Sequence, residues 1–342
     1  MWSIVYLFLG FVRTSYTINE WLHTFFFLNP VIEGVEWRNC DLMRGLEFIK
    51  SKQQSWAQRN NFELIGGTKP NKGETNYLNS LTENLFEPLT SQNLIHYNSG
   101  DGHETRDSRT RLAKMKAIHS SSAIVVNLFQ YWQGKNIYPI MRACNLCAKD
   151  SSYLVEKESN QSISQTPFDY KIKFEEQFEI SEDKDLFPYT PNIDVVIENF
   201  RPKVFAIESK FTEPYCKRHG GLKTKYVENK SFWNGLPHLY QLAKEISPDN
   251  NKYQYLDAAQ LLKHILGLKK NCKNFHLVYL WYDVIGTEGT EHRKEIEQFA
   301  EIAQKDNIKF SHTTYQEIII KLSKEFYAGN ERYCDYLTER YL

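Results

Sequence analysis

The sequence predicts an α/β protein with a mixed sheet flanked by helices, preceded by an N-terminal, mostly helical extension. Two apolar runs, 193–197 and 204–211, flank a short turn that contains Pro202, which is typical of a β-hairpin. A third strand pattern precedes the hairpin, and helical periodicity stands on both sides of it. The order helix, three strands, helix, strand favours an αβββαβ core with a mixed sheet.

The composition is that of an ordinary globular protein. The chain has 342 residues, of which 41% are hydrophobic and 25% are charged, so it is long enough to bury a large core. Its formal net charge is zero. The whole molecule therefore gives no sign of a nucleic-acid partner, and only local charge can indicate one.

The N-terminal segment is apolar from Trp2 to Val12, which is shorter than the roughly 20 residues needed to span a bilayer. No Lys or Arg precedes it and no clear cleavage site follows, so a signal peptide fits poorly. Two interpretations remain open: a helix packed on the body, or a natural start downstream, for example at Met43. We expect no association with a membrane.

Six cysteines are too few for a dense disulfide framework in a chain of this length. Cys144 and Cys147 form a CxxC motif, but no second CxxC supplies the other ligands of a structural zinc site. Cys216 and His219 could in principle contribute. We favour free thiols in a reducing cytoplasm, and hence a cytoplasmic protein.

The extension, residues 1–110, is predicted to contain a helix over 41–59 and a short helix within 77–97. Residues 65–76 and 98–110 are rich in polar residues and glycine and are predicted to be loops. A basic run follows, for which a solvated face is the favoured interpretation over a binding surface. Its members are Arg106, Arg109, Arg111, Lys114 and Lys116.

The core of the chain, residues 111–312, is predicted to begin with a helix that Ser120 or Ser121 caps and that runs to Trp132. Residues 133–168 are polar and predicted to be irregular.

A half-buried strand is then predicted over 171–180. Its alternation places Glu176 on the apolar face, where it could supply a third metal ligand, and leaves Glu175 and Glu179 on the face expected to be wet.

The hairpin brings charged residues together at the end of an apolar sheet. Asp194 and Glu208 each lie about seven residues from Arg201, so strand pairing puts them within the cross-strand range of roughly 5–8 Å. Glu208 and Lys210 point the same way because side chains alternate along a strand. Two neighbouring carboxylates repel each other unless a cation lies between them, and Mg²⁺ is suited to that position. The alternative is a Glu–Lys salt bridge on a solvated face.

These strings resemble a known family. PNID at 191–194 with IESK at 207–210 resembles the core of the PD-(D/E)xK nuclease superfamily, and IESKFTEPY resembles a restriction-endonuclease-like branch of it. The likeness extends over roughly residues 119–300. Its other strings are HSSSAIVVNLF at 119–129, YLDAAQLLKHILGL at 255–268, and LVYLWYDV followed by EGTEHRKEI within 277–296.

The resemblance implies a restriction-type endonuclease that cuts double-stranded DNA with Mg²⁺ or Mn²⁺, and a homodimer would suit a palindromic site. Asp194 and Glu208 would bind the metal with the Ser209 backbone carbonyl, and Lys210 would orient the attacking water. Gln260 falls where several branches place a helical glutamine near the metal.

The sequence departs from the family pattern at the helix before the sheet, which often carries a further carboxylate. The matching helix has Asn127 and no acid. Two alternatives stay open: a catalytically impaired nucleic-acid-binding protein, and a two-carboxylate hydrolase of sugars, which Lys210 beside Glu208 makes less suitable.

A basic loop leaves the second hairpin strand and contains Gly220 and Gly221. Such a loop could neutralise phosphates of nucleic acid, or it could simply be solvated. The candidate phosphate-binding residues are Lys217, Arg218, Lys223 and Lys225.

The rest of the core is predicted to comprise a helix over 253–266, a strand over 275–284, a helix over 291–304 and a strand over 308–311. Residues 313–342 are predicted to form C-terminal helices packed on the core, over 314–326 and 331–342.

Overall fold

The computed structural model describes the chain from residue 44 to its end, apart from short internal gaps. Residues 43–342 form one compact unit. None of the helices within the described residues is long and apolar enough to cross a bilayer. The apolar run 2–12 lies outside the described part of the chain. The described ranges are 44–66, 75–99, 104–147, 170–198, 203–216 and 219–342.

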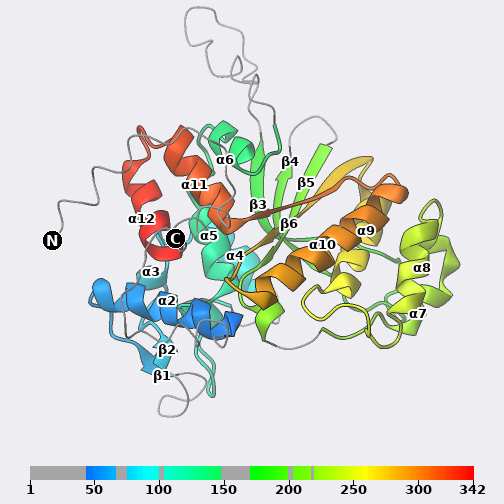
Figure 1. Ribbon diagram of the computed structural model, residues 1–342, viewed down its shortest axis with the longest axis horizontal. Helices are drawn as coiled ribbons and strands as arrows, with labels where there is room; N and C mark the ends of the chain where they lie inside the picture. The colour runs from blue at the N-terminus through cyan, green and yellow to red at the C-terminus, as the bar shows by residue number, and fades with distance from the viewer. Residues whose placement is uncertain (1–43, 67–74, 100–103, 148–169, 199–202, 217–218) are drawn as a thin grey trace, which may run out of the picture. The chain divides into compact units, whose positions relative to one another are not determined.

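A five-stranded sheet with the order β3-β4-β5-β6-β7 forms the centre of this unit (Figure 1). The pairs β3–β4 and β4–β5 are antiparallel, whereas β5–β6 and β6–β7 are parallel. The predicted mixed α/β class is therefore confirmed. The strands are β3 (Lys171–Gln177), β4 (Asn192–Glu198), β5 (Lys203–Lys210), β6 (Asn274–Trp281) and β7 (Phe310–Thr314).

The register of the β4–β5 hairpin is the one that the sequence predicts. Val195 lies opposite Ile207, and Ile197 lies opposite Phe205, so each pair is centred on position 201. Continuing the same register by one residue places Asp194 opposite Glu208. The turn between the strands falls outside the described residues.

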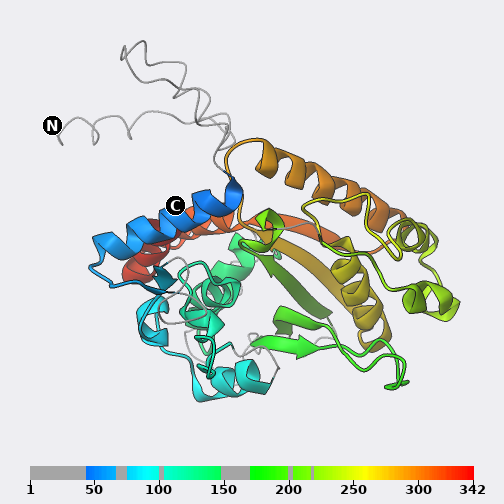
Figure 2. The same cartoon turned by 90° about the horizontal axis from the view of Figure 1, so that it is seen from below.

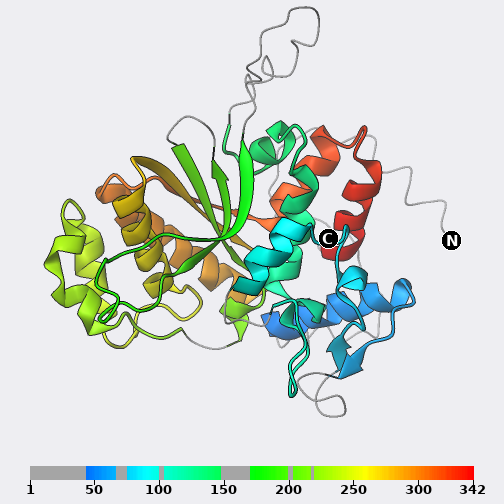
Figure 3. The ribbon, with the colours of Figure 1, turned by 180° about the vertical axis from the view of Figure 1, so that it is seen from behind.

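Helices cover both faces of the sheet (Figure 2). One face packs against α5, α6, α11 and α12 through a core that includes Val195, Ile207 and Leu280. The other packs against α8, α9 and α10 through a core that includes Val196, Ala206 and Tyr279. Figure 3 shows the two groups on either side of the strands. The helices are α5 (Ser121–Phe129), α6 (Tyr138–Ala143), α8 (Pro237–Glu245), α9 (Ala258–Asn271), α10 (Thr287–Lys305), α11 (Tyr315–Glu325) and α12 (Glu331–Tyr341).

The N-terminal helices pack on α12 through a fully buried arginine. Arg340 donates hydrogen bonds to the carbonyl of Asn84 at 2.8 Å and to Gln53 Oε1 at 3.1 Å, and its guanidinium lies 4.0 Å from the Trp56 ring centroid. Removing one of these partners would leave a donor of a buried charged group without its hydrogen bond, which is costly. The first helices and the last therefore stabilise each other. They are α2 (Gly45–Arg59), α3 (Leu81–Asn84) and α4 (Ser91–Ser99).

Several boundaries differ from the predictions. The predicted strand over 171–180 ends at Gln177, and the predicted loop 65–76 contributes to a small sheet of β1 (Ile65–Gly66) and β2 (Thr75–Tyr77). The segment 133–168, predicted to be irregular, contains α6, whose first turn accommodates Pro139.

The predicted helix over 253–266 begins later, because the Asp257 side chain accepts a hydrogen bond from the Gln260 amide and caps α9. The predicted basic loop contains the short helix α7 (Thr224–Glu228) and the 3₁₀ turn η7 (Lys230–Trp233).

Candidate active site

Glu208 and Lys210 lie on the same face of β5, turned toward α9, and both are almost fully buried. Only 1% of Glu208 and 8% of Lys210 is exposed. The Lys210 ammonium lies 2.6 Å from Glu208 Oε1 and donates a further hydrogen bond of 2.8 Å to Gln260 Oε1. The buried lysine is thus held by one charged and one neutral oxygen. A salt bridge on a solvated face, the alternative from the sequence, does not describe this pair.

α9 supplies the side chains that face this pair. Gln260 and His264 are four residues apart and therefore lie on the same stripe of the helix. The His264 Nε2 lies 2.8 Å from Glu208 Oε2, and both side chains are buried. Apart from this contact, Glu208 Oε2 has no side-chain partner within the described residues. His264 is therefore the group next to the second oxygen of Glu208.

Asp194 joins the cluster from β4. Its Oδ2 accepts a hydrogen bond of 2.7 Å from the backbone amide of Ser209. Although the residue is half-buried as a whole, its carboxyl is enclosed. Burial, together with the carboxylates of Glu208 and Glu175, raises the pKa of Asp194 well above its ordinary value.

The pKa of Glu208 is shifted in the opposite direction to that of Asp194. Burial alone would raise its pKa, but the Lys210 ammonium and His264 outweigh that effect and lower the pKa to about 2. Burial would lower the pKa of Lys210, yet Glu208, Asp194 and Glu213 raise it. Glu208 and Lys210 are therefore both ionised near neutral pH, and Asp194 is the carboxyl of this pair whose pKa is raised.

The third acid near the pair is Glu175. The register of β3 and β4 pairs Phe174 with Val195 and Glu176 with Ile193, which leaves Glu175 opposite Asp194. Its backbone φ of 56° is left-handed, which is uncommon for glutamate.

The Glu175 carboxylate accepts a hydrogen bond of 2.9 Å from Asn192 Nδ2. Burial raises its pKa to about 7, and the charges of Glu104 and Glu208 add to that effect.

Glu176, the residue that the sequence suggested for a third carboxylate, has other partners in the structure. Its carboxylate lies 3.9 Å from His96 Nδ1 and 4.0 Å from Lys173 Nζ, at a half-exposed position. The face of β3 that holds Glu175 was expected to be wet, but the sheet is covered on both faces. The left-handed backbone at Glu175 also interrupts the alternation on which the expectation depended.

Asn127, on the helix that precedes the sheet, serves the core. Its amide accepts a hydrogen bond of 2.7 Å from the Phe86 backbone amide and donates to Asn84 O and Tyr341 Oη. The same helix also affects the acidic residues indirectly, because Ser122 donates a hydrogen bond of 2.9 Å to Glu104. Glu104 is thereby held close enough to affect Glu175.

The residues of the cluster suit a hard divalent cation. The carboxyls of Asp194 and Glu208 share one nearby ammonium, that of Lys210, so their combined negative charge is only partly compensated. Mg²⁺ is bound by one or two carboxylates with water completing its shell. Within the described ranges, no three His, Cys, Asp or Glu side chains gather as a metal-ion site. The donors that fit are therefore the pair Asp194 and Glu208.

The predicted phosphate-binding residues have different surroundings. Lys223 and Lys225 line a pocket beside α9, and Lys225 also donates a hydrogen bond to the Leu186 carbonyl. Lys217 and Arg218 lie outside the described residues.

Two members of the predicted basic run are paired, which favours its interpretation as a solvated face. Lys114 lies 2.9 Å from Glu104, and Lys116 lies 2.8 Å from Asp107.

The CxxC cysteines follow α6 directly, with Cys144 as its C-cap. Cys144 is buried in the core and Cys147 is half-buried, and both are free thiols. Burial raises the pKa of each thiol.

Sequence reasoning missed His264 and Glu175. The spacing of four residues from Gln260 could have indicated His264, once that glutamine was placed on a helix beside the strand. Glu175 could have been found by pairing the strand over 171–177 with β4, because the register puts it across from Asp194.

A mixed α/β sheet that carries two carboxylates and a lysine on adjacent strands is consistent with a restriction-endonuclease-like protein. The comparison with family models agrees: the model described as "Restriction Endonuclease associating with ARP" matches residues 50–342, and the chain belongs to that family. The comparisons with curated proteins and with solved structures find no significant match.

Proposed function

We propose that the protein is a restriction-type endonuclease that hydrolyses phosphodiester bonds of double-stranded DNA with Mg²⁺ or Mn²⁺. The observation that carries the proposal is the buried cluster in which Lys210 contacts Glu208 and Gln260 while Asp194 lies across the hairpin. The family supplies the reaction class, and the chemistry of these side chains supports it. In this proposal, the order of α5, the strands β3 to β5, α9 and β6 is the αβββαβ nuclease core.

Asp194, Glu208 and the backbone carbonyl of Ser209 would hold the metal ion. When bound, that ion polarises the scissile phosphate and makes a water molecule more acidic. Glu208 is ionised already, since its pKa is lowered to about 2, whereas Asp194 must release its proton to become a ligand. Ser209 helps to orient Asp194, because its amide donates to the Asp194 carboxylate.

Lys210 would donate a hydrogen bond to the attacking water, and its positive charge would stabilise the negative charge that builds up on the phosphate oxygens. The ammonium has three donors, and two of them are directed to Glu208 and Gln260. The third remains for substrate. Gln260 acts as a positioning residue in this scheme, since it fixes the Lys210 ammonium through its amide oxygen.

The alternative is a protein of the same fold that binds nucleic acid without cutting it. The absence of an acid at Asn127 favoured this alternative, but Glu175 lies opposite Asp194 and contributes to its raised pKa. A carboxylate from another strand therefore lies near the pair, although the three groups do not gather as a metal site within the described residues.

Incubation of the protein with supercoiled plasmid tests the proposal. We expect nicked and linear DNA in the presence of Mg²⁺ and intact plasmid in the presence of EDTA. The Asp194→Asn variant should leave the plasmid intact in both. A protein that retards DNA in a gel but never cuts it, with Mg²⁺ or Mn²⁺ and DNA of varied sequence, would establish the alternative. Size-exclusion chromatography with light scattering tests the proposed homodimer.

A further inference from the structure

A pocket of about 240 Å³ opens beside the catalytic cluster, between α9, α7 and the segment that leads into β4. Three lysines and no acidic residue are among its lining residues. The lining comprises Tyr189, Thr190, Pro191, Gly221, Leu222, Lys223, Lys225, Tyr226, Ala259 and Lys263.

Residues that line the pocket are direct neighbours in the chain of residues in the cluster. Ala259 immediately precedes Gln260, and Lys263 immediately precedes His264, so two adjacent stripes of α9 face the pocket and the cluster. On the opposite wall, Pro191 lies three residues before Asp194. A polymer that occupied the cluster would pass this pocket.

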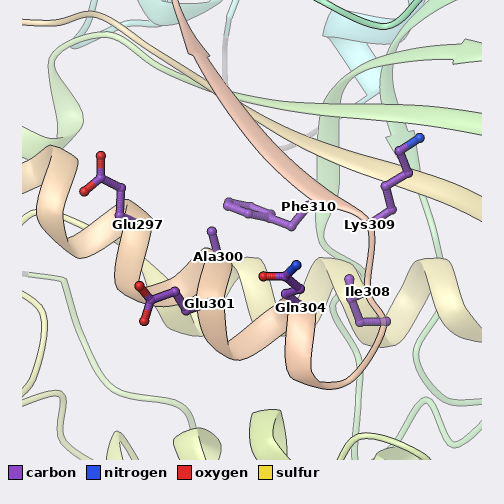
Figure 4. Close-up of a pocket in the computed structure, with 7 residues that line it drawn as sticks. All are labelled: Glu297, Ala300, Glu301, Gln304, Ile308, Lys309 and Phe310. Atoms are coloured by element: carbon purple, nitrogen blue, oxygen red, sulfur yellow. The ribbon is translucent and has the colours of Figure 1, made fainter.

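The charge of the pocket is distinctive. A larger pocket of about 560 Å³ lies between α10 and β7, and its charged residues are Glu297, Glu301 and Lys309. Figure 4 shows the two glutamates along α10, with Lys309 beside Phe310. That pocket would repel a polyanion, whereas the smaller pocket would attract one.

Two of the pocket lysines lack partners of their own. Within the described residues, neither Lys223 nor Lys263 makes an ion pair or a side-chain hydrogen bond. Lys263 is half-buried, and burial lowers its pKa, whereas the carboxylates of Asp257 and Glu208 act in the opposite direction. A bound anion would give the two lysines of the pocket a partner.

Lys225, the third lysine of the pocket, contacts the segment before β4. It donates a hydrogen bond to the Leu186 carbonyl, and its ammonium lies 4.9 Å from the Phe187 ring centroid. These contacts hold the segment that contains Tyr189 against α7. Tyr189 itself is 79% exposed on the rim of the pocket, which leaves its ring free to pack against a sugar or a base.

We propose that this pocket binds a backbone phosphate of the DNA strand next to the scissile phosphate. Lys223 and Lys263 contact the phosphate oxygens, and Tyr189 packs against the neighbouring nucleotide. The subsite rests on the proposed function only in taking DNA as its ligand.

The salt dependence of DNA binding tests the subsite. Fluorescence anisotropy with a labelled duplex of mixed sequence, in EDTA, gives the affinity over a series of KCl concentrations. Each phosphate contact contributes about 0.9 to the slope of log K against log salt concentration. The proposed subsite holds one phosphate, so we expect the double variant Lys223→Gln, Lys263→Gln to have a slope that is less steep by about 0.9. Lys309→Gln, in the acidic pocket, is the matched control and should keep the native slope.

Tyr189→Ala tests the uncharged contact separately. We expect its affinity for the duplex to fall about tenfold, with the native salt slope, because stacking releases no counterions. Tyr189→Phe keeps the ring and should keep the affinity. Thermal unfolding of each variant shows whether it is folded, and Lys263→Gln should not lower the midpoint because it removes a half-buried charge.

The outcomes separate this inference from the proposed nuclease activity. A native slope in the double variant overturns the subsite, even if the protein cuts plasmid. A reduced slope in that variant, with the native slope in Lys309→Gln, supports the subsite, even if plasmid stays intact and the nuclease proposal fails.

Discussion

Gln260 accepts a hydrogen bond of 2.8 Å from the Lys210 ammonium, and this contact joins α9 to the central strand of the sheet. The two residues are fifty positions apart in the chain. Because α9 also brings His264 to Glu208, one helix fixes both charged residues of the ExK motif. The predictions below test what each member of this cluster contributes.

Lys210→Ala should abolish cleavage while leaving most of the DNA affinity. Loss of a group that stabilises developing charge lowers rates by roughly 10²-fold or more. The same change leaves Glu208 buried without its cation, which lowers the free energy of unfolding by roughly 3–5 kcal/mol. Plasmid cleavage, gel retardation and chemical denaturation measure the three effects.

A second variant separates chemistry from folding in this test. The double variant Glu208→Gln, Lys210→Gln removes both charges and should recover much of the lost stability without recovering activity. Metal-dependent cutting by folded Lys210→Ala protein would remove Lys210 from the mechanism.

Gln260→Ala should lower kcat by about tenfold or more, since the hydrogen bond from a charged donor is lost and the ammonium is less well fixed. The KM for DNA should stay close to native, because Gln260 positions Lys210 and is not expected to anchor the strand. Gln241→Ala, on the surface of α8, is the control for replacing a helical glutamine. Unchanged steady-state kinetics in Gln260→Ala would show that the contact has no role in turnover.

Asp194→Ala should weaken Mg²⁺ binding in isothermal titration calorimetry. In the native protein, the raised pKa of Asp194 means that a proton competes with the metal. Affinity should therefore rise with pH, and the heat of binding should depend on the ionisation enthalpy of the buffer. Asp185→Asn, in an exposed loop, should titrate as the native protein does. A native titration in Asp194→Ala would exclude Asp194 as a ligand.

In the absence of metal, the stability of Glu175→Gln relative to the native protein should increase as the pH rises. The pKa of Glu175 is raised to about 7, so the folded state holds its proton more tightly than the unfolded chain does. The free energy of unfolding of the native protein therefore falls as the pH rises from the ordinary pKa of a glutamate to about 7, by up to about 3 kcal/mol. The glutamine variant lacks this loss.

The measurement is the difference in unfolding free energy between Glu175→Gln and the native protein, in EDTA, from pH 4 to pH 8. That difference should grow with pH and then level off above about 7. Adding Mg²⁺ should reduce it, because the cation stabilises the ionised carboxylates. A difference independent of pH would show that Glu175 is not buried beside the pair.

Much of the central hairpin could be predicted from local sequence. The alternation of apolar residues and the turn fixed the register, because a slip by one residue would expose every buried side chain of β4 and β5. This register places Asp194 across from Glu208. The sequence offers Ser120 or Ser121 as the cap of the helix before the sheet, and in the structure Ser120 accepts the hydrogen bond from the backbone amide three residues on.

Other features needed the whole fold. Glu175 was assigned to a wet face because periodicity reports one apolar face, whereas this sheet is covered by helices on both. The contacts of α9 with Glu208 and Lys210 join residues that no local pattern connects.

The sequence by itself determined the hairpin, its register and the types of charged residue at its end, because these depend on alternation and turn chemistry over some twenty residues. The tertiary structure alone decided which carboxyl has a raised pKa, which side chains of α9 face Glu208 and where the basic pocket lies. Those properties depend on burial and on charges that come from distant segments, and Coulomb interactions follow distance in space and not separation along the chain.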